Sequence, residues 1–202
     1  MEPEFQQQGC GLMVYPAGGW RKALFKAPLW LWRMGLGAIL GRFYLVLTTT
    51  GWKSHQPRHT VLEFSVRDGR AYISPGWGRR TIWYRNILAD PRVTAERAGR
   101  AESAIAVHVT AEEELAQVYR QAKGTSPVWQ QWLESWGVRD EEPDFIAAHK
   151  DRLITLRLDP TTDKTPPPLR ADLVWVWPLL LLVAMIAYHT LFGSSVRSAS
   201  SA

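Results

Sequence analysis

The chain has 202 residues, of which 46% are hydrophobic, so it is long enough for one domain with its own core and additional segments. The net charge of +5 comes from Lys and Arg spread along the chain, which fits a phosphorylated ligand or an anionic membrane surface at least as well as nucleic acid. Cys10 is the only cysteine, which excludes an internal disulfide, and the five histidines show no metal-ligand spacing, so no metal site is predicted.

The N-terminal part of the chain divides into two segments. Residues 1–19 are rich in Gly and Gln, are predicted to be irregular, and lack the basic start and apolar core of a signal peptide. Residues 20–41 are predicted to be helical with a kink at Pro28, because apolar and basic residues fall on opposite sides of a helix. This helix either lies on a membrane surface or packs on its own domain, and the sequence leaves both interpretations open.

Six strand patterns in hairpin order make up the middle of the chain. They cover residues 45–50, 59–66, 71–74, 92–97, 102–109 and 153–158. Asp68-Gly69 and Gly99 supply turns, and helices are predicted at residues 81–89, 110–123, 127–136 and 144–149. This order predicts an α+β fold built on an antiparallel barrel or curved sheet rather than a parallel sheet.

The turn between the first two strands is a candidate anion site. The first strand is predicted to break at Thr50-Gly51, where glycine can take a positive φ. Lys53, Ser54 and Arg58 follow, so two cations, a hydroxyl and free backbone N–H groups would converge on an anion. The alternative is a solvated basic turn, because the segment lacks the fixed spacing of a P-loop.

A linker and an apolar segment end the chain. Residues 159–172 contain three consecutive prolines and are predicted to be extended and stiff. Residues 173–192 carry no formal charge and have tryptophans near one end, which predicts a single-pass transmembrane helix rather than a buried core helix.

Positive charge near the apolar segment sets the expected orientation. Lys164 and Arg170 precede the segment, and Arg197 lies in the short tail of residues 193–202. This bias predicts that the large domain, residues 20–158, faces the cytoplasm.

Two sequence segments resemble the deazaflavin-dependent nitroreductase family, a branch of the split β-barrel flavin and deazaflavin oxidoreductases. They are TTTGWKSHQPR at residues 48–58 and WYRNILADPRV at residues 83–93, which are specific only in combination. The resemblance runs from about Leu24 to Leu158. It implies a split antiparallel β-barrel with flanking helices, often dimeric, that uses reduced coenzyme F-420 (a deazaflavin) as hydride donor to quinones, nitroaromatics or other activated acceptors.

The resemblance also implies a set of coenzyme-binding residues. Lys53, Ser54 and Arg58 would bind the phosphate and the acidic tail of the coenzyme. Further contacts are implied for Thr50, Gly51, Gln56, Pro57, Ser74, Gly76, Trp77, Gly78, Ile82 and Trp83. The family usually has a basic residue where this chain has Trp52 and a glycine where it has His55, so FMN or haem remain alternative cofactors.

Tyr84 is the one side chain that the sequence offers as a catalytic group, because a tyrosine can protonate a reduced oxygen. The alternative is a tyrosine that packs in the core or lies on the surface. We therefore expect a membrane-anchored oxidoreductase that passes a hydride to a quinone or nitro-type acceptor, and the resemblance makes a homodimer an additional expectation. A non-catalytic, anchored split-barrel protein is the second hypothesis, and nucleic-acid binding is not expected because no concentrated basic face is interleaved with aromatic residues.

Overall fold

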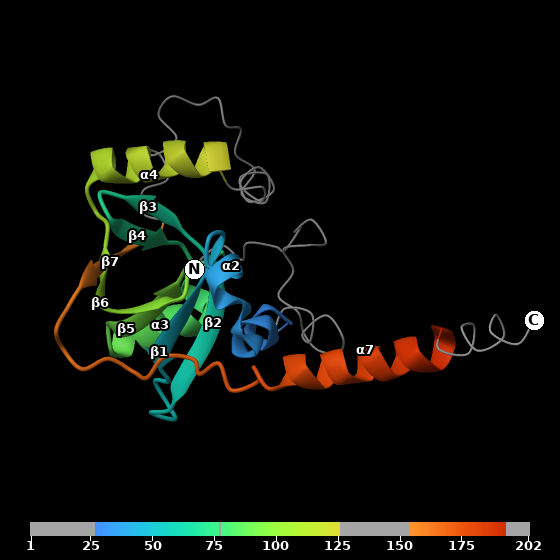
Figure 1. The fold of residues 1–202 in the computed structure, drawn as a ribbon. Helices are drawn as coiled ribbons and strands as arrows, with labels where there is room; N and C mark the ends of the chain where they lie inside the picture. Colours follow the sequence, from blue (N-terminus) through green and yellow to red (C-terminus); the bar gives the residue numbers. More distant parts are fainter. Residues whose placement is uncertain (1–26, 77, 126–153, 193–202) are drawn as a thin grey trace, which may run out of the picture.

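A computed structural model describes residues 27–76, 78–125 and 154–192. Within these ranges seven strands form one antiparallel sheet in the order β2-β1-β5-β6-β7-β4-β3, and the sheet curls around its core (Figure 1). The strands are β1 (Tyr44–Thr50), β2 (Pro57–Glu63), β3 (Ser65–Arg67), β4 (Arg70–Ile73), β5 (Arg92–Arg97), β6 (Arg100–His108) and β7 (Leu156–Pro160). The expected curved antiparallel sheet with flanking helices is thereby confirmed.

Two details of the strand prediction are wrong. The predicted strand over residues 59–66 is divided at Phe64 into β2 and β3, which pair with different neighbours, β1 and β4. The last strand begins at Leu156 instead of residue 153. The turn predictions are confirmed, because Asp68 and Gly69 both adopt positive φ between β3 and β4, which matches the twist of a tight hairpin.

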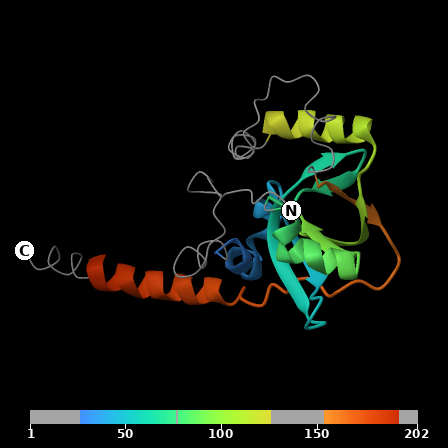
Figure 2. The ribbon, with the colours of Figure 1, turned by 180° about the vertical axis from the view of Figure 1, so that it is seen from behind.

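Helices flank the sheet on several sides (Figures 1 and 2). They are the π-helix η1 (Trp32–Leu36), α2 (Gly37–Leu40), the 3-10 turn η2 (Gly78–Arg80), α3 (Ile82–Ala89), α4 (Glu112–Thr125) and α7 (Val176–Phe192). Residues 20–26, which precede the kink expected at Pro28, lie outside the described residues; residues 27–31 are helical, and the helical backbone is interrupted at Gly35, whose φ is 88°. The helices predicted at residues 127–136 and 144–149 lie outside the described residues.

The inner face of the curled sheet forms the hydrophobic core. Alternate residues of the strands point inward, and α3 adds Trp83, Tyr84 and Ile87, which are all at most 5% exposed. β1 is buried on its outer face as well, since Val46 and Thr48 are as fully buried as Leu45 and Leu47. A strand buried on both faces explains why its sequence is apolar and threonine-rich throughout.

Strand pairing brings several chain segments to one end of the sheet. At this end β1, β4 and β6 finish, and β2, β5 and β7 begin. The pairs that define it are Thr50–Pro57, Arg92–Ile105, His108–Leu156 and Ile73–Leu156. We call this end the rim; the segments that enter or leave the sheet there include residues 51–56 and 74–81.

The predicted linker is a strap across the outer face of the sheet. We use this name for residues 161–172, which run past β6, β5 and β1 in extended conformation. Thr165 Oγ1 lies 2.8 Å from the hydroxyl oxygens of both Thr94 and Ser103. Thr94 also donates a hydrogen bond to the carbonyl oxygen of Pro166. Proline has no backbone N–H, so Pro166 is held to the sheet through its carbonyl group.

The strap continues to a buried carboxylate and then to η1. The backbone N–H of Leu169 donates to Glu96 Oε1 at 2.6 Å, and the side chain of Trp32 donates to the same carboxylate. Further along, Asp172 accepts two hydrogen bonds of 2.7 Å from Arg33. The segment expected to be an extended, stiff linker is therefore fixed to the domain by hydrogen bonds and an ion pair.

The apolar C-terminal segment begins its helix later than expected. A turn occupies residues 172–175, fixed by a hydrogen bond from the Leu173 N–H to the Arg33 carbonyl, so α7 begins at Val176 instead of residue 173. Among the described residues no helix has the length and apolar character to cross a membrane, so the transmembrane helix expected over residues 173–192 is not found.

The buried carboxylate under the strap predicts a pH-dependent stability difference. Burial raises the pKa of Glu96 above its usual 4.5, although the hydrogen bonds from Leu169 and Trp32 oppose this shift. When the pKa of a carboxyl group is higher in the folded state than in the unfolded state, folding is most stable below the unfolded-state pKa, where the group is protonated in both states. This stability is lost as pH rises through the folded-state pKa. We therefore expect Glu96→Gln, which keeps an acceptor for Leu169, to melt higher than the parent at pH 8, by roughly 2–4 °C per kcal/mol removed.

The difference should disappear below pH 4.5, where the parent carboxyl is also neutral. Thermal melts from pH 4 to pH 8 measure it, with exposed Glu102→Gln as the control that shows no comparable trend. A lower melting temperature for Glu96→Gln at pH 8 than for the parent would contradict this account of the strap.

Candidate functional site

The turn between β1 and β2 is closed by its own backbone. The N–H of Gly51 donates to the carbonyl of Gln56 at 2.9 Å, and the N–H of His55 donates to the carbonyl of Gly51 at 2.7 Å. Gly51 does not use the positive φ that glycine allows; a Cβ there would lie 2.6 Å from Ser54 Oγ and 3.2 Å from the carbonyl oxygen of Gln56, so a larger residue would require Ser54 to shift. The positive φ falls on His55, at 53°, a region in which a non-glycine residue is uncommon.

The polar groups expected to bind an anion lie together on this turn. Arg58 Nη2 donates to Ser54 Oγ at 3.2 Å, so the guanidinium and the hydroxyl lie next to each other. Lys53 Nζ lies 4.6 Å from the ring centroid of Trp52, a cation–π arrangement. All four side chains are exposed, so the two cations are accessible to a ligand from solvent.

A buried asparagine that the sequence did not reveal joins this turn to α3. Asn86 is 1% exposed; its Oδ1 accepts a 3.1 Å hydrogen bond from the backbone N–H of Trp52, and its Nδ2 donates to Thr49 Oγ1 at 2.8 Å. One side chain thus satisfies a donor of the turn and an acceptor of β1. The position of the turn on the rim is therefore set by α3.

The start of α3 offers unpaired polar groups at the same rim. Thr81, the N-cap residue, is 4% exposed, and its Oγ1 is the one buried side-chain nitrogen or oxygen without a hydrogen-bond partner in the described part of the chain. The first N–H groups of any α-helix also lack intrahelical partners. A Cβ added at Gly76 or Gly78 would meet no atom within 4 Å, so the approach beside them is open.

The remaining predicted coenzyme-binding residues differ in how far they are accessible. Ile82 is 56% exposed, whereas the Trp83 ring is 5% exposed in the core, so a ligand at the rim would reach Trp83 through its backbone. Ser74 Oγ lies 3.2 Å from Thr155 Oγ1, and Thr50 hydrogen-bonds the carboxylate of Asp90. Gln56 and Pro57 lie on the β1–β2 turn and at the start of β2; Trp77 lies outside the described residues.

Tyr84 has a partner that the sequence did not reveal. Its hydroxyl oxygen lies 3.2 Å from Nε2 of His108, and the two rings meet edge to face at a centroid distance of 5.6 Å. Burial raises the pKa of Tyr84 and lowers the pKa of His108, and the charge of Arg79 lowers both. With 2% exposure, Tyr84 lies beneath the rim and His108 lies at its surface.

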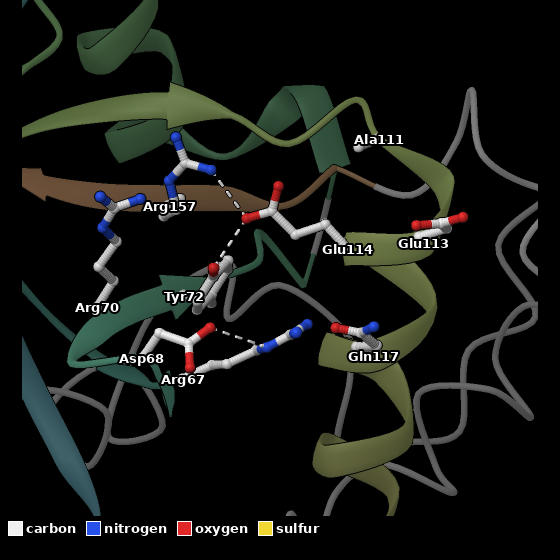
Figure 3. A pocket seen from close by; sticks show the side chains of 9 residues that line it. All are labelled: Arg67, Asp68, Arg70, Tyr72, Ala111, Glu113, Glu114, Gln117 and Arg157. Atoms are coloured by element: carbon white, nitrogen blue, oxygen red, sulfur yellow. Dashed lines mark hydrogen bonds and ion pairs between the residues drawn. The ribbon is translucent and has the colours of Figure 1, made fainter.

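A separate hollow of about 340 Å³ lies between α4 and the β3–β4 hairpin (Figure 3). Glu114 accepts hydrogen bonds from Tyr72 and Arg157, and Arg157 also binds Asp159 through two nitrogens. Burial would raise the pKa of Glu114, but these two donors hold it below its usual value. Because Glu114 comes from α4 and its two donors come from β4 and β7, this network fastens α4 to the sheet.

Comparison with known proteins places this chain in a family. Residues 34–137, just over half of the chain, match the family model described as F-420H(2)-dependent quinone reductase. Similar solved structures include an F-420-H2 dependent reductase, with 19% identity and a TM-score of 0.45 over 58% of this chain and 95% of that chain. A conserved hypothetical protein from Mycobacterium tuberculosis has 19% identity and a TM-score of 0.39, covering 61% of this chain and 79% of that chain.

The two hydrogen bonds of the Asn86 side chain predict a loss of stability when this residue is replaced. Asn86→Leu keeps a similar volume but leaves the Trp52 N–H and the Thr49 hydroxyl without their partner, which should lower the free energy of unfolding by about 1–3 kcal/mol. Urea denaturation measures the loss. Leu88→Ala, an exposed position on the same helix, is the matched control and should change it by less than about 0.5 kcal/mol. Equal effects of the two substitutions would show that Asn86 does not hold the turn.

Proposed function

The chain belongs to the F-420H(2)-dependent quinone reductase family and is an oxidoreductase, and on this premise we propose that it transfers a hydride from reduced coenzyme F-420 to a quinone or a nitro-type acceptor. The observation that carries the proposal is the rim, where Asn86 joins the cationic β1–β2 turn to the helix whose start has unpaired polar groups. One rigid connection therefore sets two binding regions relative to each other. Because the family uses F-420, we do not propose FMN or haem as the cofactor.

The residues of the rim fit the chemistry of this coenzyme. Lys53 and Arg58 are exposed cations beside a hydroxyl, and they would hold the phosphate and the acidic tail. Thr81 Oγ1, with the free N–H groups at the start of α3, would bind polar atoms of the ring system. The open space at Gly76 and Gly78 would admit a flat ring against the backbone.

The protein's own contribution is mainly placement. When bound, the coenzyme supplies the hydride. The residues of the rim would fix its orientation, so that donor and acceptor atoms meet in one geometry. Such positioning removes much of the entropic barrier that two freely diffusing reactants would face.

We further propose that α7 attaches the chain to a membrane, where a lipid-soluble quinone is concentrated. Every described side chain from Trp177 to His189 is exposed, and none carries a formal charge at neutral pH. Leaving this much apolar surface in water is unfavourable, and acyl chains would cover it. The catalytic domain would face the cytoplasm, in keeping with the positive flank at Lys164 and Arg170; a homodimer stays a prediction.

The cationic turn predicts the determinants of coenzyme affinity. Lys53→Ala and Arg58→Ala each remove one charged donor, and a hydrogen bond to a charged group contributes about 1.5–3 kcal/mol, so each should weaken F-420 binding by roughly 10- to 100-fold. Fluorescence titration with F-420 measures the dissociation constant. Arg100→Ala, at the opposite end of β6, removes the same kind of charge and should leave it unchanged. If all three variants bind F-420 equally well, the β1–β2 turn does not bind the acidic tail of the coenzyme.

The exposed helix predicts the determinants of membrane association. Leu181 and Ile186 are 70% and 54% exposed, so replacing both with Asp should leave the fold intact but make contact with acyl chains unfavourable. When the protein is floated with phosphatidylglycerol–phosphatidylcholine vesicles, the parent should be found in the lipid fraction and the double variant should not. Turnover with a water-soluble quinone should stay at the parent rate. If the double variant floats with the vesicles as fully as the parent does, attachment through α7 is ruled out.

A further inference from the structure

The Tyr84–His108 pair has a geometry suited to proton transfer. Tyr84 reaches from α3 through the core, and its hydroxyl oxygen meets His108 Nε2 at 3.2 Å. The tyrosine is 2% exposed, whereas the histidine is exposed. A buried hydroxyl on one ring nitrogen fixes the orientation of the imidazole and leaves its other nitrogen, Nδ1, to meet groups outside the core.

Strand register places His108 at the rim, on the side that faces the core. It is the last residue of β6 and follows Ala104 and Ala106 on the inward-facing side of that strand. It pairs with Leu156, which pairs in turn with Ile73, the residue before the segment that leads into α3. His108 therefore lies at the same rim as the start of α3.

Reduction of a quinone by a hydride also requires a proton, which placement of the coenzyme does not supply. The acceptor gains two electrons and one hydrogen and becomes a hydroquinone monoanion, which needs one proton to become the neutral hydroquinone. A general acid must supply this proton, and a histidine at the surface of the site is the usual choice near neutral pH. The hydroxyls of Ser74, Thr155 and Tyr119 are poor acids for this purpose; burial raises the pKa of Tyr119 to about 12.

We propose that His108 is a catalytic residue that donates this proton to the hydride-reduced acceptor, with Tyr84 as the residue that positions its imidazole. The inference rests on the proposed function. In the step, the Nδ1–H bond of the imidazolium breaks and an O–H bond of the hydroquinone forms. The imidazole is left neutral, with its remaining hydrogen on Nε2 and directed at the Tyr84 oxygen, and a proton from water restores the cation.

The surroundings of the pair make the imidazolium a stronger acid than a free histidine. Burial lowers the pKa of His108 below its usual 6.5, and the positive charge of Arg79 lowers it further. Arg79 and Tyr84 are the charged and titratable groups that the described structure places next to it. Tyr84 itself is held protonated by burial, so it orients the histidine without giving up its own proton.

The direct test is the pH dependence of turnover with reduced F-420 and a water-soluble quinone. In the parent, kcat should rise as pH falls through a midpoint below 6.5. His108→Gln should lower kcat by about 100-fold and abolish this pH dependence, because an amide does not titrate. In His108→Ala, added imidazole should restore part of the rate. Tyr84→Phe should keep the pH dependence but move its midpoint down, since the imidazolium loses an acceptor for its Nε2–H.

His59→Gln is the matched control, since His59 also bonds a hydroxyl, Thr48 Oγ1 at 2.9 Å, but on the outer face of the sheet. It should keep both kcat and the pH profile of the parent. Thermal melts of all variants separate a loss of chemistry from a loss of fold. A His108→Gln enzyme that turns over at the parent rate with the parent pH profile overturns the proposal and leaves the proposed function standing.

A second readout needs no coenzyme. Nuclear magnetic resonance titration of the imidazole of His108 in the full chain should give a midpoint below 6.5, and Tyr84→Phe should move that midpoint. If the parent chain binds no F-420, the proposed function fails, and the titration still decides whether Tyr84 controls the imidazole. An unchanged midpoint in Tyr84→Phe would remove Tyr84 as the positioning residue.

Discussion

The side-chain amide of Asn86 is the contact on which the site depends. It receives the backbone N–H of Trp52 and donates to Thr49, so a helix, a strand end and a turn are fixed by one buried group. A buried amide that is satisfied on both sides adds rigidity, whereas an unsatisfied one would be costly. The exposed cations of the turn can therefore stay accessible to solvent while their backbone is held in one position.

Burial of β1 on both faces supports this arrangement from behind. Its inner face packs in the core, and Val46 and Thr48 on its outer face are completely buried too. The strap is held along its length, by hydrogen bonds of Thr165 with Thr94 and Ser103, by the Leu169–Glu96 hydrogen bond and by the Arg33–Asp172 ion pair. The strand that leads into the β1–β2 turn is thus the most enclosed element of the sheet, and the turn itself is among the most open.

Local sequence was enough where the structure depends on local geometry. Asp68-Gly69 supplies a backbone conformation that few other pairs adopt, so the hairpin could be predicted, and the cations of the β1–β2 turn were visible as residue types. Contacts between distant segments were not predictable in this way. Nothing nearby separates Asn86 from a surface asparagine except its position between Trp83 and Ile87 on the buried face of α3, and His108 lies 24 residues from Tyr84. The contacts of the strap could not be predicted for the same reason, because a proline-rich composition predicts an extended backbone but not what that backbone binds.

We propose that the rim, built from the β1–β2 turn and the start of α3, holds the coenzyme. Backbone amide chemical shifts recorded during titration with oxidised F-420 show where it binds. The large shifts should fall on residues 51–58 and 78–83, and those of Tyr72 and Glu114, beside the hollow under α4, should stay unchanged. Shifts centred on that hollow, with the β1–β2 turn unaffected, would contradict this proposal.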